Sequence, residues 1–383
     1  MAKLGDVCEV LNGFAFKSDQ YVESGIRIIR IANVQKGYIE DSSPAFYPMD
    51  SIEAKKYQLK ENDLLMSLTG NVGRVGLLTS NFLPAALNQR VACLRIKDSS
   101  TLEKAYLFHV LNSDFFEQKC IESANGVAQK NMSTEWLKEY EIPLPPLDEQ
   151  RRIAAVLDKV SGLIAKRREQ LDKLDELVKA RFVEMFGDET EFDRWPSCTI
   201  GDVADICVGV VIKPTQYYAD QGIPAFRSLN IGEMRVKDGD WVYFTKEGHQ
   251  KNQKSVVRKN DVLVVRSGAP GTACVATEKY DGYNAVDIII AHPDNTKVDS
   301  TFLAAFTNMP HGMNQIRGRT GGAAQQHFNV GGYKTLRLIM PPMDQQQKFA
   351  SFVKQTDKSK LTIQQSLDKL EVLKKALMQQ YFG

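Results

Sequence analysis

The chain has 383 residues, of which 43% are hydrophobic and 25% charged, and its formal net charge is +2. This composition is typical of a soluble globular protein with two or more domains, and no apolar run is long enough to cross a bilayer. The six cysteines are scattered without a CxxC pair. That argues against a zinc site or a disulfide framework and predicts free thiols in a cytoplasmic protein.

Charge is balanced in both halves of the chain. Residues 1–145 carry 16 basic and 18 acidic groups, and residues 188–341 carry 17 of each. A protein that binds DNA by itself usually has a basic excess. Strong autonomous DNA binding is therefore not expected, and any phosphate contacts must come from local clusters or be shared with a partner.

Short apolar or β-branched runs bounded by turn residues predict strands at 26–34, 63–69 and 91–96. An amphipathic helix is predicted near 102–119. From Ile153 onward, seam positions follow alternating steps of four and three, which predicts a long heptad helix. Two arginines interrupt its seam, which consists of Leu157, Val160, Ile164, Arg167, Leu171, Leu174, Val178, Arg181 and Met185.

The second half of the chain has the same order of elements. Strands are predicted at 223–231, 261–267 and 285–291, followed by a helix near 300–309. A second heptad seam consists of Phe349, Val353, Thr356, Lys360, Ile363, Leu367, Leu370, Lys374, Leu377 and Tyr381. Each long helix covers about 38 residues, or about 57 Å. Asp148 and Asp344, directly after Pro-Pro pairs, are predicted as the N-caps.

These parallels come from an internal repeat. Shifted by 196 positions, residues 126–187 fall on residues 322–383 without a gap, and 18 of the 62 positions are identical. Pro145 to Gln150 matches Pro341 to Gln346, and both copies end in Phe-Gly. The chain is therefore two copies of one unit, each a globular part followed by a long helix.

Each long helix is amphipathic and needs a partner for its apolar face. The other copy is the obvious partner, and the globular segment between the helices allows an antiparallel return. The alternative is that each helix packs only on its own domain. The fold class predicted is α+β, with two similar mixed α/β domains separated by two long antiparallel coiled-coil helices. The boundaries predicted are 1–145, 146–187, 188–341 and 342–383.

Several segments together resemble the specificity subunits of type I restriction–modification systems. These segments are GDV…GFAFKS…Y (5–21), GIRIIRIANV (25–34), SLTGNVG (67–73), NQR (88–90) and IPLPPLDEQ (142–150) before a long helix that ends in Phe-Gly. The duplication is the strongest mark. The second half departs from the pattern, with Val208–Pro214 where the first has AFKS, and Gln345–Gln347 where the first has Glu149–Arg151.

The resemblance implies that each globular part is a target-recognition domain for one half of a bipartite, asymmetric DNA sequence. It implies that the helices pair as a spacer and dock methyltransferase subunits, and that restriction/translocase subunits join the complex. The partners implied are double-stranded DNA and these subunits, with no membrane. S-adenosylmethionine is expected in the methyltransferase subunit; this chain is expected to have no cofactor, metal site or catalytic residue of its own.

Recognition of DNA bases requires side chains that make two hydrogen bonds to one base edge, such as Arg with guanine and Asn or Gln with adenine. Candidates in polar or glycine-rich stretches of the first domain are Lys17, Ser18, Arg30, Asn33, Thr69, Asn71, Arg74, Gln89, Arg90, Gln129, Lys130 and Asn131. Those in the second domain are Lys213, Arg227, Asn230, Arg266, Ser267, Arg317, Arg319, Gln325, Gln326 and His327. A basic cluster of possible phosphate contacts comprises Lys251, Lys254, Arg258 and Lys259. The GxxG pairs at 70–73 and 268–271 are interpreted as tight turns.

Two other functions stay open from the sequence. A non-catalytic coiled-coil adaptor that binds protein partners rather than DNA agrees with the near-neutral charge, although the diverged polar loops argue against it. A nuclease or methyltransferase acting by itself is disfavoured, because the sequence has no Walker A motif, GxGxxG, HExxH, GxSxG or Asn-Pro-Pro-Tyr motif.

Overall fold

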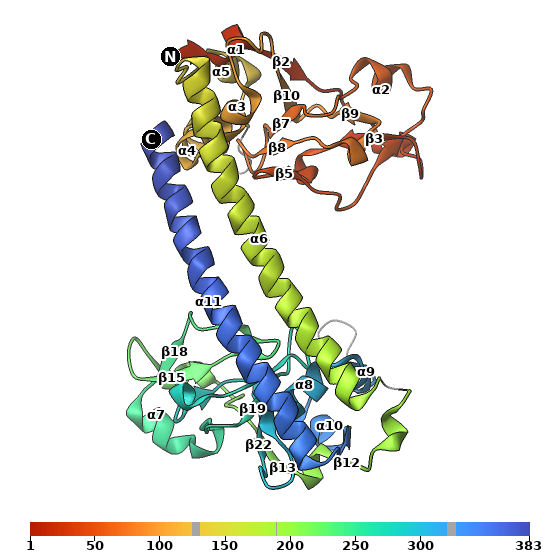
Figure 1. Cartoon of the computed structure of the whole chain (residues 1–383), viewed down its shortest axis with the longest axis vertical. Helices are drawn as coiled ribbons and strands as arrows, with labels where there is room; N and C mark the ends of the chain where they lie inside the picture. Colours follow the sequence, from red (N-terminus) through yellow and green to blue (C-terminus); the bar gives the residue numbers. More distant parts are fainter. Residues whose placement is uncertain (125–130, 189, 320–326) are drawn as a thin grey trace. The chain divides into compact units, whose positions relative to one another are not determined.

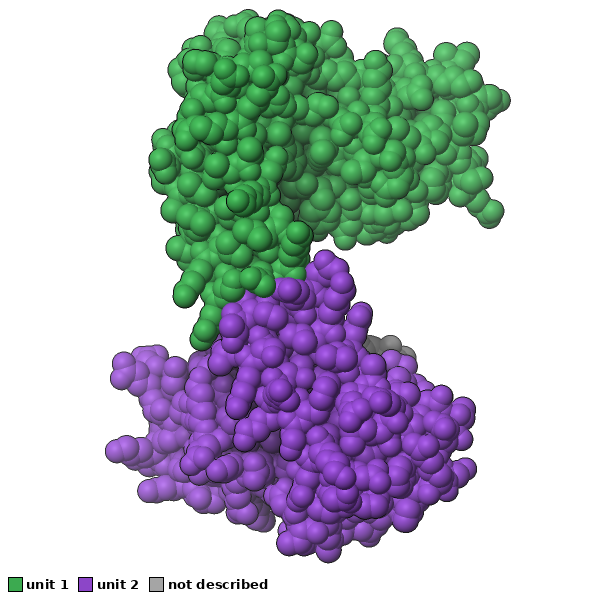
Figure 2. Space-filling view, viewed as in Figure 1, with its two compact units in different colours: residues 1–168, 365–383 green, residues 169–364 purple. Residues whose placement is uncertain are grey.

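The computed structural model describes residues 1–124, 131–188, 190–319 and 327–383. The chain divides into two compact units (Figure 2): unit 1 holds residues 1–168 and 365–383, and unit 2 holds residues 169–364. Each unit contains one globular part, one end of the first long helix and the opposite end of the second. Unit 2 is therefore one continuous stretch of the sequence, whereas unit 1 is made of two stretches that are far apart in the sequence.

The described part of unit 1 combines two main sheets with short helices (Figure 1). The antiparallel four-stranded sheet has the order β2 (Cys8–Asn12), β10 (Val91–Ile96), β7 (Leu64–Ser67), β8 (Val75–Leu77). A three-stranded sheet has the order β6 (Phe46–Tyr47), β3 (Ile26–Ile29), β9 (Ala85–Leu87). The two-stranded pairs are β1 (Ala2–Lys3) with β11 (Glu141–Ile142) and β4 (Val34–Gln35) with β5 (Tyr38–Ile39). The α-helices of this part are α1 (Leu4–Val7), α2 (Ile52–Lys56), α3 (Lys104–Leu111), α4 (Asp114–Ser123) and α5 (Thr134–Glu139).

Unit 2 repeats the four-stranded sheet with the same strand order in its described residues. That sheet runs β13 (Ala204–Val208), β22 (Ile288–Pro293), β19 (Val262–Val265), β20 (Ala273–Val275). The second sheet runs β14 (Tyr218–Ala219), β18 (Val242–Phe244), β15 (Ile223–Phe226), β21 (Asn284–Ala285). The two-stranded pairs are β12 (Ser197–Thr199) with β23 (Arg337–Ile339) and β16 (Ile231–Gly232) with β17 (Arg235–Val236). The α-helices are α7 (Lys246–Lys251), α8 (Ser300–Asn308), α9 (Pro310–Arg317) and α10 (Val330–Lys334).

The long helices are α6 (Leu147–Phe186) and α11 (Met343–Phe382), each of 40 residues. Every position of both predicted seams is buried or half-buried, which confirms the heptad prediction. In unit 1, Arg168 of α6 forms an ion pair with Glu371 of α11 at 2.7 Å. In unit 2, Lys360 of α11 forms an ion pair with Asp175 of α6 at 2.6 Å. From Arg168 to Asp175 on α6 the partner on α11 runs backwards from Glu371 to Lys360, so the helices pair antiparallel and do not pack only on their own domains.

Each helix pair is also anchored in the core of its unit. The unit 1 core includes Leu157 near the start of α6 and Phe382 at the end of α11, whose ring lies 5.6 Å from that of Tyr106. In unit 2, Phe182 near the end of α6 packs against Phe349 near the start of α11, with ring centroids 5.5 Å apart. Aromatic pairs at such distances add to the free energy of apolar burial. The helix ends are therefore fixed in each core.

Two predictions about helices were wrong, and one helix was not predicted. The helix near 102–119 is two helices, because Ser113 caps α4 through a hydrogen bond from the N–H of Phe116. The helix predicted near 300–309 is confirmed as α8, but α9 was not predicted; it starts at Pro310, which has no N–H with which to continue α8. Asp148 and Asp344 lie in the first turns of the long helices rather than at the caps. The reason for the last error is that the carbonyl of each preceding proline already accepts the first helical N–H groups.

A buried glutamine fixes the start of each long helix. The side chain of Gln150 is fully buried, accepts a hydrogen bond from the N–H of Glu103 at 2.8 Å and donates to the carbonyls of Thr101 and Pro145. Gln346 repeats this arrangement with the N–H of Asp299 and the carbonyl of Pro341. This explains physically why both copies have glutamine as the fourth residue of the long helix.

A charged pair across the four-stranded sheet differs between the units. In unit 1, Arg95 on β10 binds the buried Asp63 through two hydrogen bonds of 2.8 and 2.6 Å. In unit 2, His292 on β22 takes the place of the arginine and lies 2.7 Å from Asp261, with the thiol of Cys207 at 3.7 Å. The hydrogen bond with Asp261 raises the pKa of His292 to about 9, so the imidazolium form is the partner of this buried carboxylate.

We predict that Gln150→Ala destabilises unit 1 by about 2 kcal/mol, because it leaves a buried N–H and two carbonyls without their side-chain partner. Denaturant unfolding of the full chain measures the change. Gln347→Ala, an exposed glutamine in the first turns of α11, is the matched control and is expected to have little effect. Equal stability of the two variants would contradict this role for Gln150.

The pair of His292 and Asp261 predicts a pH dependence of stability. Because the folded-state pKa lies above the unfolded value, the stabilisation is complete below about pH 6.5 and is lost as the pH rises through about 9. The expected loss is on the order of 2 kcal/mol, after a discount for partial exposure of the imidazole. His292→Arg copies the unit 1 pair and should abolish this dependence. Denaturant unfolding from pH 6 to 10 measures it, and the same slope in both proteins would refute the assignment.

Candidate nucleic-acid interface

A glycine turn follows one of the two central strands of the four-stranded sheet in each unit, β7 or β19. Gly70 after β7 has φ of +74°, and Gly268 after β19 has φ of +90°, which favours glycine at both positions. A Cβ atom on Gly73 would lie 2.7 Å from Cys120, and one on Gly271 would lie 2.8 Å from Ile316. The GxxG segments are therefore tight turns packed against α4 and α9, as the sequence predicted.

The strand-end cluster of unit 1 consists of Thr69, Gln89, Arg90 and Asn131. The N–H of Leu68 donates to the carbonyl of Arg90 at 3.0 Å, and the hydroxyl of Thr69 donates to the side chain of Asn131 at 2.8 Å. The side chains of Gln89, Arg90 and Asn131 are exposed. Residues 62 positions apart in the sequence thus meet beside the glycine turn. Amide, hydroxyl and guanidinium groups here could bind base edges.

The strand-end cluster of unit 2 consists of Arg266, Ser267, Asp287 and His327. The hydroxyl of Ser267 lies 2.8 Å from Nδ1 of His327, matching the contact of Thr69 with Asn131. Arg266 is held by Asp287 at 2.6 Å and by the carbonyl of Phe328 at 3.1 Å. His327 is exposed and Arg266 is half-buried. The backbone position is the same in both units, but the groups presented to solvent are different.

The loop after the first strand of the sheet also differs between the units. In unit 1, Phe16 is buried beside Tyr47, whose hydroxyl accepts a hydrogen bond from the N–H of Lys17. The side chains of Lys17 and Ser18 are exposed. In unit 2, Ile212 is 79% exposed and Lys213 has φ of +45°. The second loop therefore projects an apolar and a basic side chain without the aromatic anchor of the first.

An Arg-x-x-Asn segment repeated in both units has a structural role. Asn33 and Asn230 are buried, and each accepts a hydrogen bond at 2.9 Å from the N–H of the arginine three residues earlier. Their amide groups donate to backbone carbonyls, for Asn230 to that of Gly239 at 2.7 Å. Arg30 and Arg227 also donate to carbonyls, those of Ser43 and Asp240. We therefore leave these four out of the proposed DNA-contacting set.

The other candidates are placed as follows. Asn71 is exposed in the unit 1 glycine turn, and Arg74 donates to Gln35 at 2.7 Å. Arg317 and Arg319 are exposed near the end of α9, where Arg319 donates to the carbonyls of Gln315 and Thr335. The four members of the basic cluster are exposed, with Lys259 paired to Glu278. The candidates outside the described residues are Gln129, Lys130, Gln325 and Gln326.

Sequence reasoning missed Asp287, which holds Arg266 in the strand-end cluster of unit 2. It lies where the first half has the NQR segment, and its φ of +50° places its carboxylate beside Arg266 and Ser267. Comparison of the two copies of the repeat could have indicated it, because the second copy has an acidic residue where the first copy has polar or basic residues. Because the carboxylate engages the guanidinium, Arg266 is less available than a free surface arginine.

The long helices carry exposed apolar side chains in both units. In unit 2, Leu177 on α6 is 46% exposed and Leu361 on α11 is 61% exposed. In unit 1, Val372 and Leu373 on α11 are 70% and 46% exposed. Several such residues on two paired helices are typical of a protein-binding surface. None of the helices in the described ranges is long and apolar enough to span a membrane.

Comparison with known proteins gives one family for both halves. The model of the type I restriction modification DNA specificity domain matches residues 1–175 and 193–374. The EcoBI specificity subunit of Escherichia coli is 24% identical, with 92% of this chain and 78% of that protein covered. The MjaVIII specificity subunit of Methanocaldococcus jannaschii is 30% identical over 47% of this chain and 43% of its own length.

Solved structures agree on the fold. The type I restriction–modification S subunit from M. genitalium aligns with a TM-score of 0.58 at 16% identity, covering 100% of this chain and 95% of that one. A chain from a structure on complex assembly and conformational transition of the type I system aligns with a TM-score of 0.57 at 18% identity, covering 100% and 96%. At these identities the likeness shows the shared fold.

Proposed function

The chain belongs to the type I restriction–modification DNA specificity family, and we propose that it reads a bipartite, asymmetric DNA target for such a complex. In this proposal, residues 1–145 and 188–341 are target-recognition domains, and residues 146–187 and 342–383 are the spacer helices. The chain brings no catalysis of its own; the partner methyltransferase subunit supplies it and holds S-adenosylmethionine. Restriction subunits complete the assembly.

One observation carries the proposal. The two units present a polar cluster at the same backbone position beside the same glycine turn, but with different side chains. Two identical readers would read a symmetric sequence, because target symmetry follows protein symmetry. Unlike readers on a duplicated scaffold fit a split target whose halves differ.

The DNA contacts that we propose come from exposed side chains of the strand-end clusters and adjacent loops. Arg90 and Gln89 in unit 1 have the forked donor and amide groups that read guanine and adenine in the major groove. In unit 2, exposed His327 is the corresponding base contact, with Lys213 and the basic cluster at 251–259 as phosphate contacts.

The balanced charge limits what this chain can do by itself. Electrostatic attraction to phosphates supplies most of non-specific DNA affinity. A chain with a net charge of +2 supplies little of it, so tight binding requires phosphate contacts from the methyltransferase subunit. We place the docking surface for that subunit on the exposed apolar side chains of the paired helices, including Leu177 and Leu373.

We predict that Arg90→Ala relaxes only the half-site read by the first domain, because one forked base contact is worth about 1–3 kcal/mol. His327→Ala, the reciprocal control, should relax only the other half-site. Sequencing of methylated bases in DNA treated with each reconstituted methyltransferase complex measures both effects. Unchanged half-sites in both variants, or loss of both half-sites in either, would contradict the assignment.

A second prediction concerns the spacing of the half-sites. Repeating residues 164–170 in α6 and 360–366 in α11 adds one heptad to each helix, or about 10.5 Å of helix. We expect an unread gap longer by about three base pairs and unchanged half-sites, since DNA rises about 3.4 Å per base pair. Insertion into one helix alone puts the seams out of register and should abolish methylation. A gap of unchanged length in the double insertion would refute the spacer role.

A further inference from the structure

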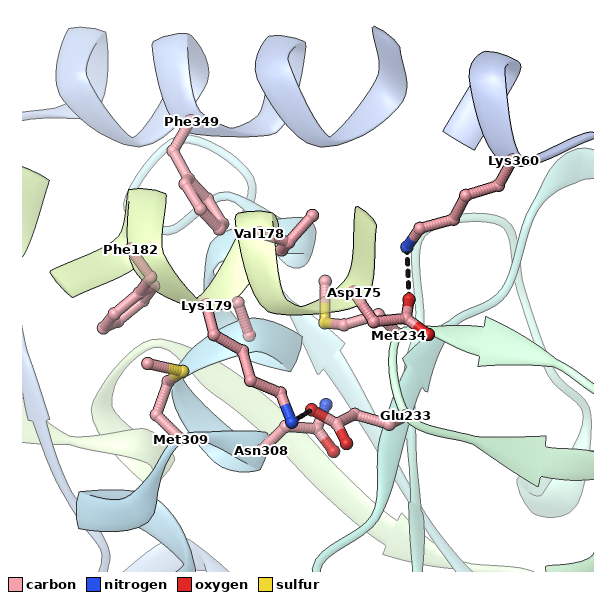
Figure 3. A pocket seen from close by; sticks show the side chains of 11 residues that line it. Asp175, Val178, Lys179, Phe182, Glu233, Met234, Asn308, Met309, Phe349 and Lys360 are labelled. Atoms are coloured by element: carbon pink, nitrogen blue, oxygen red, sulfur yellow. Dashed lines mark ion pairs between the residues drawn. The ribbon is translucent and has the colours of Figure 1, made fainter. Parts of the chain in front are cut away.

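The internal repeat gives each unit a corresponding cleft between its helix pair and its globular part. The cleft of unit 2 is lined by Asp175, Val178, Lys179, Phe182, Glu233 and Lys360, among others (Figure 3). The cleft of unit 1 is lined by Lys36, His109, Asp158, Arg168, Lys374 and Lys375, among others. The 196-residue shift places Val178 on Lys374 and Lys179 on Lys375. The tight turn between β4 and β5 places Lys36 where the turn between β16 and β17 has Glu233.

The cleft of unit 2 is almost filled by side chains and its charges are paired. Val178 and Phe182 are 5% and 1% exposed, and the remaining cavity is about 20 Å³. Lys179 forms an ion pair with Glu233 at 2.8 Å, and Lys360 forms one with Asp175 at 2.6 Å (Figure 3). Nothing in this cleft requires a further ligand.

The cleft of unit 1 is open, with a volume of about 670 Å³. Its acidic groups already have partners: Asp114 pairs with Lys36 and Glu371 with Arg168, each at 2.7 Å, and Asp158 lies 2.7 Å from His109, whose pKa is lowered by burial. Because lysine stands where unit 2 has Glu233, Lys375 does not have the acidic partner that pairs with Lys179 in unit 2.

Lys374 is the side chain with the clearest need for a partner. It is half-buried, and no ion pair joins its ammonium to a described residue. Burial lowers the pKa of Lys374, and the positive charges of Arg168 and Lys36 lower it further, although Asp158 opposes them. A half-buried cation among other cations is a costly arrangement that an incoming anion would relieve.

We propose that the unit 1 cleft receives a carboxylate side chain of the methyltransferase subunit, which pairs with Lys374 and Lys375. The inference rests on the proposed function, because the partner is the subunit that this function requires. It follows that the methyltransferase subunit binds more tightly at unit 1 than at the corresponding place on unit 2.

Two observations favour a protein carboxylate over a DNA phosphate. Val372 and Leu373, directly before the two lysines, are 70% and 46% exposed, and exposed apolar side chains next to a charged cleft fit a protein partner. Asp114, Asp158 and Glu371 also line the cleft. A continuous polyanion would meet these carboxylates, whereas a single side chain can avoid them.

The test is a titration of the methyltransferase subunit into the full chain, with the binding steps resolved by calorimetry and native mass spectrometry. The wild-type chain should bind the methyltransferase subunit in two steps of unequal affinity. Lys374→Met should weaken the tighter step by about tenfold or more, and leave the weaker step unchanged. Lys369→Met, at an exposed position of the same helix, is the matched control and should leave both steps unchanged.

Thermal unfolding of the same variants separates docking from folding. Lys374→Met removes a half-buried charge, so its melting temperature should equal or exceed that of wild type while its partner binding falls. Two binding steps of equal affinity in wild type would overturn this inference but not the proposed function. The same would follow if Lys374→Met bound the methyltransferase subunit as tightly as wild type does. Weaker DNA binding by Lys374→Met with unchanged subunit binding would overturn it in favour of a phosphate. Absence of any subunit binding by wild type would overturn the proposed function as well.

Discussion

The structure depends on the burial of two long amphipathic seams that no single globular part can cover. Each helix begins on the core of one unit and ends in the core of the other, as Leu157 and Phe186 do on α6. Because the return helix brings Phe382 into the core of unit 1, that core is complete only when the last residues of the chain have arrived. The two halves of the sequence are thereby folded into units that each contain both long helices.

The duplicated chain keeps the polar residues that the backbone needs and changes those that solvent reaches. Gln150 and Gln346 hold the same backbone groups, and Asn33 and Asn230 hold equivalent turns. Loss of a buried hydrogen-bonding group leaves partners unsatisfied, which is costly in either copy. An exposed side chain such as Gln89 or Arg90 holds no such buried group, so its identity is free to follow a binding partner.

The sequence predicted the parts of the fold that depend on periodicity. Both seams and the strands at 64–67 and 91–96 were found, because burial imposes a regular spacing on apolar residues. It did not predict the break at Ser113, because an apolar helical pattern continues across it. It placed the end of the helix near 300–309 correctly but did not predict that Pro310 starts a further helix. It also misplaced the caps by two residues, since a proline carbonyl can occupy the cap position without a polar side chain.

The candidate site was harder to predict because residue type does not reveal exposure. Arg30 and Asn33 have the groups that read bases, but the folded chain directs those groups to its own carbonyls. The meeting of Thr69 with Asn131 depends on a pairing between segments far apart in sequence, which no local pattern encodes.

Comparison of the two copies supplies part of what a single sequence lacks. A polar residue buried in the same way in both copies serves the scaffold. Where the copies differ at one position of the repeat, as with the half-buried Lys374 and the buried Val178, the difference cannot be a requirement of the shared fold. A duplicated chain thus contains its own control. Val178 is buried in the core of unit 2, whereas Lys374 lines the open cleft of unit 1, so the charge of Lys374 serves no packing that the two copies share.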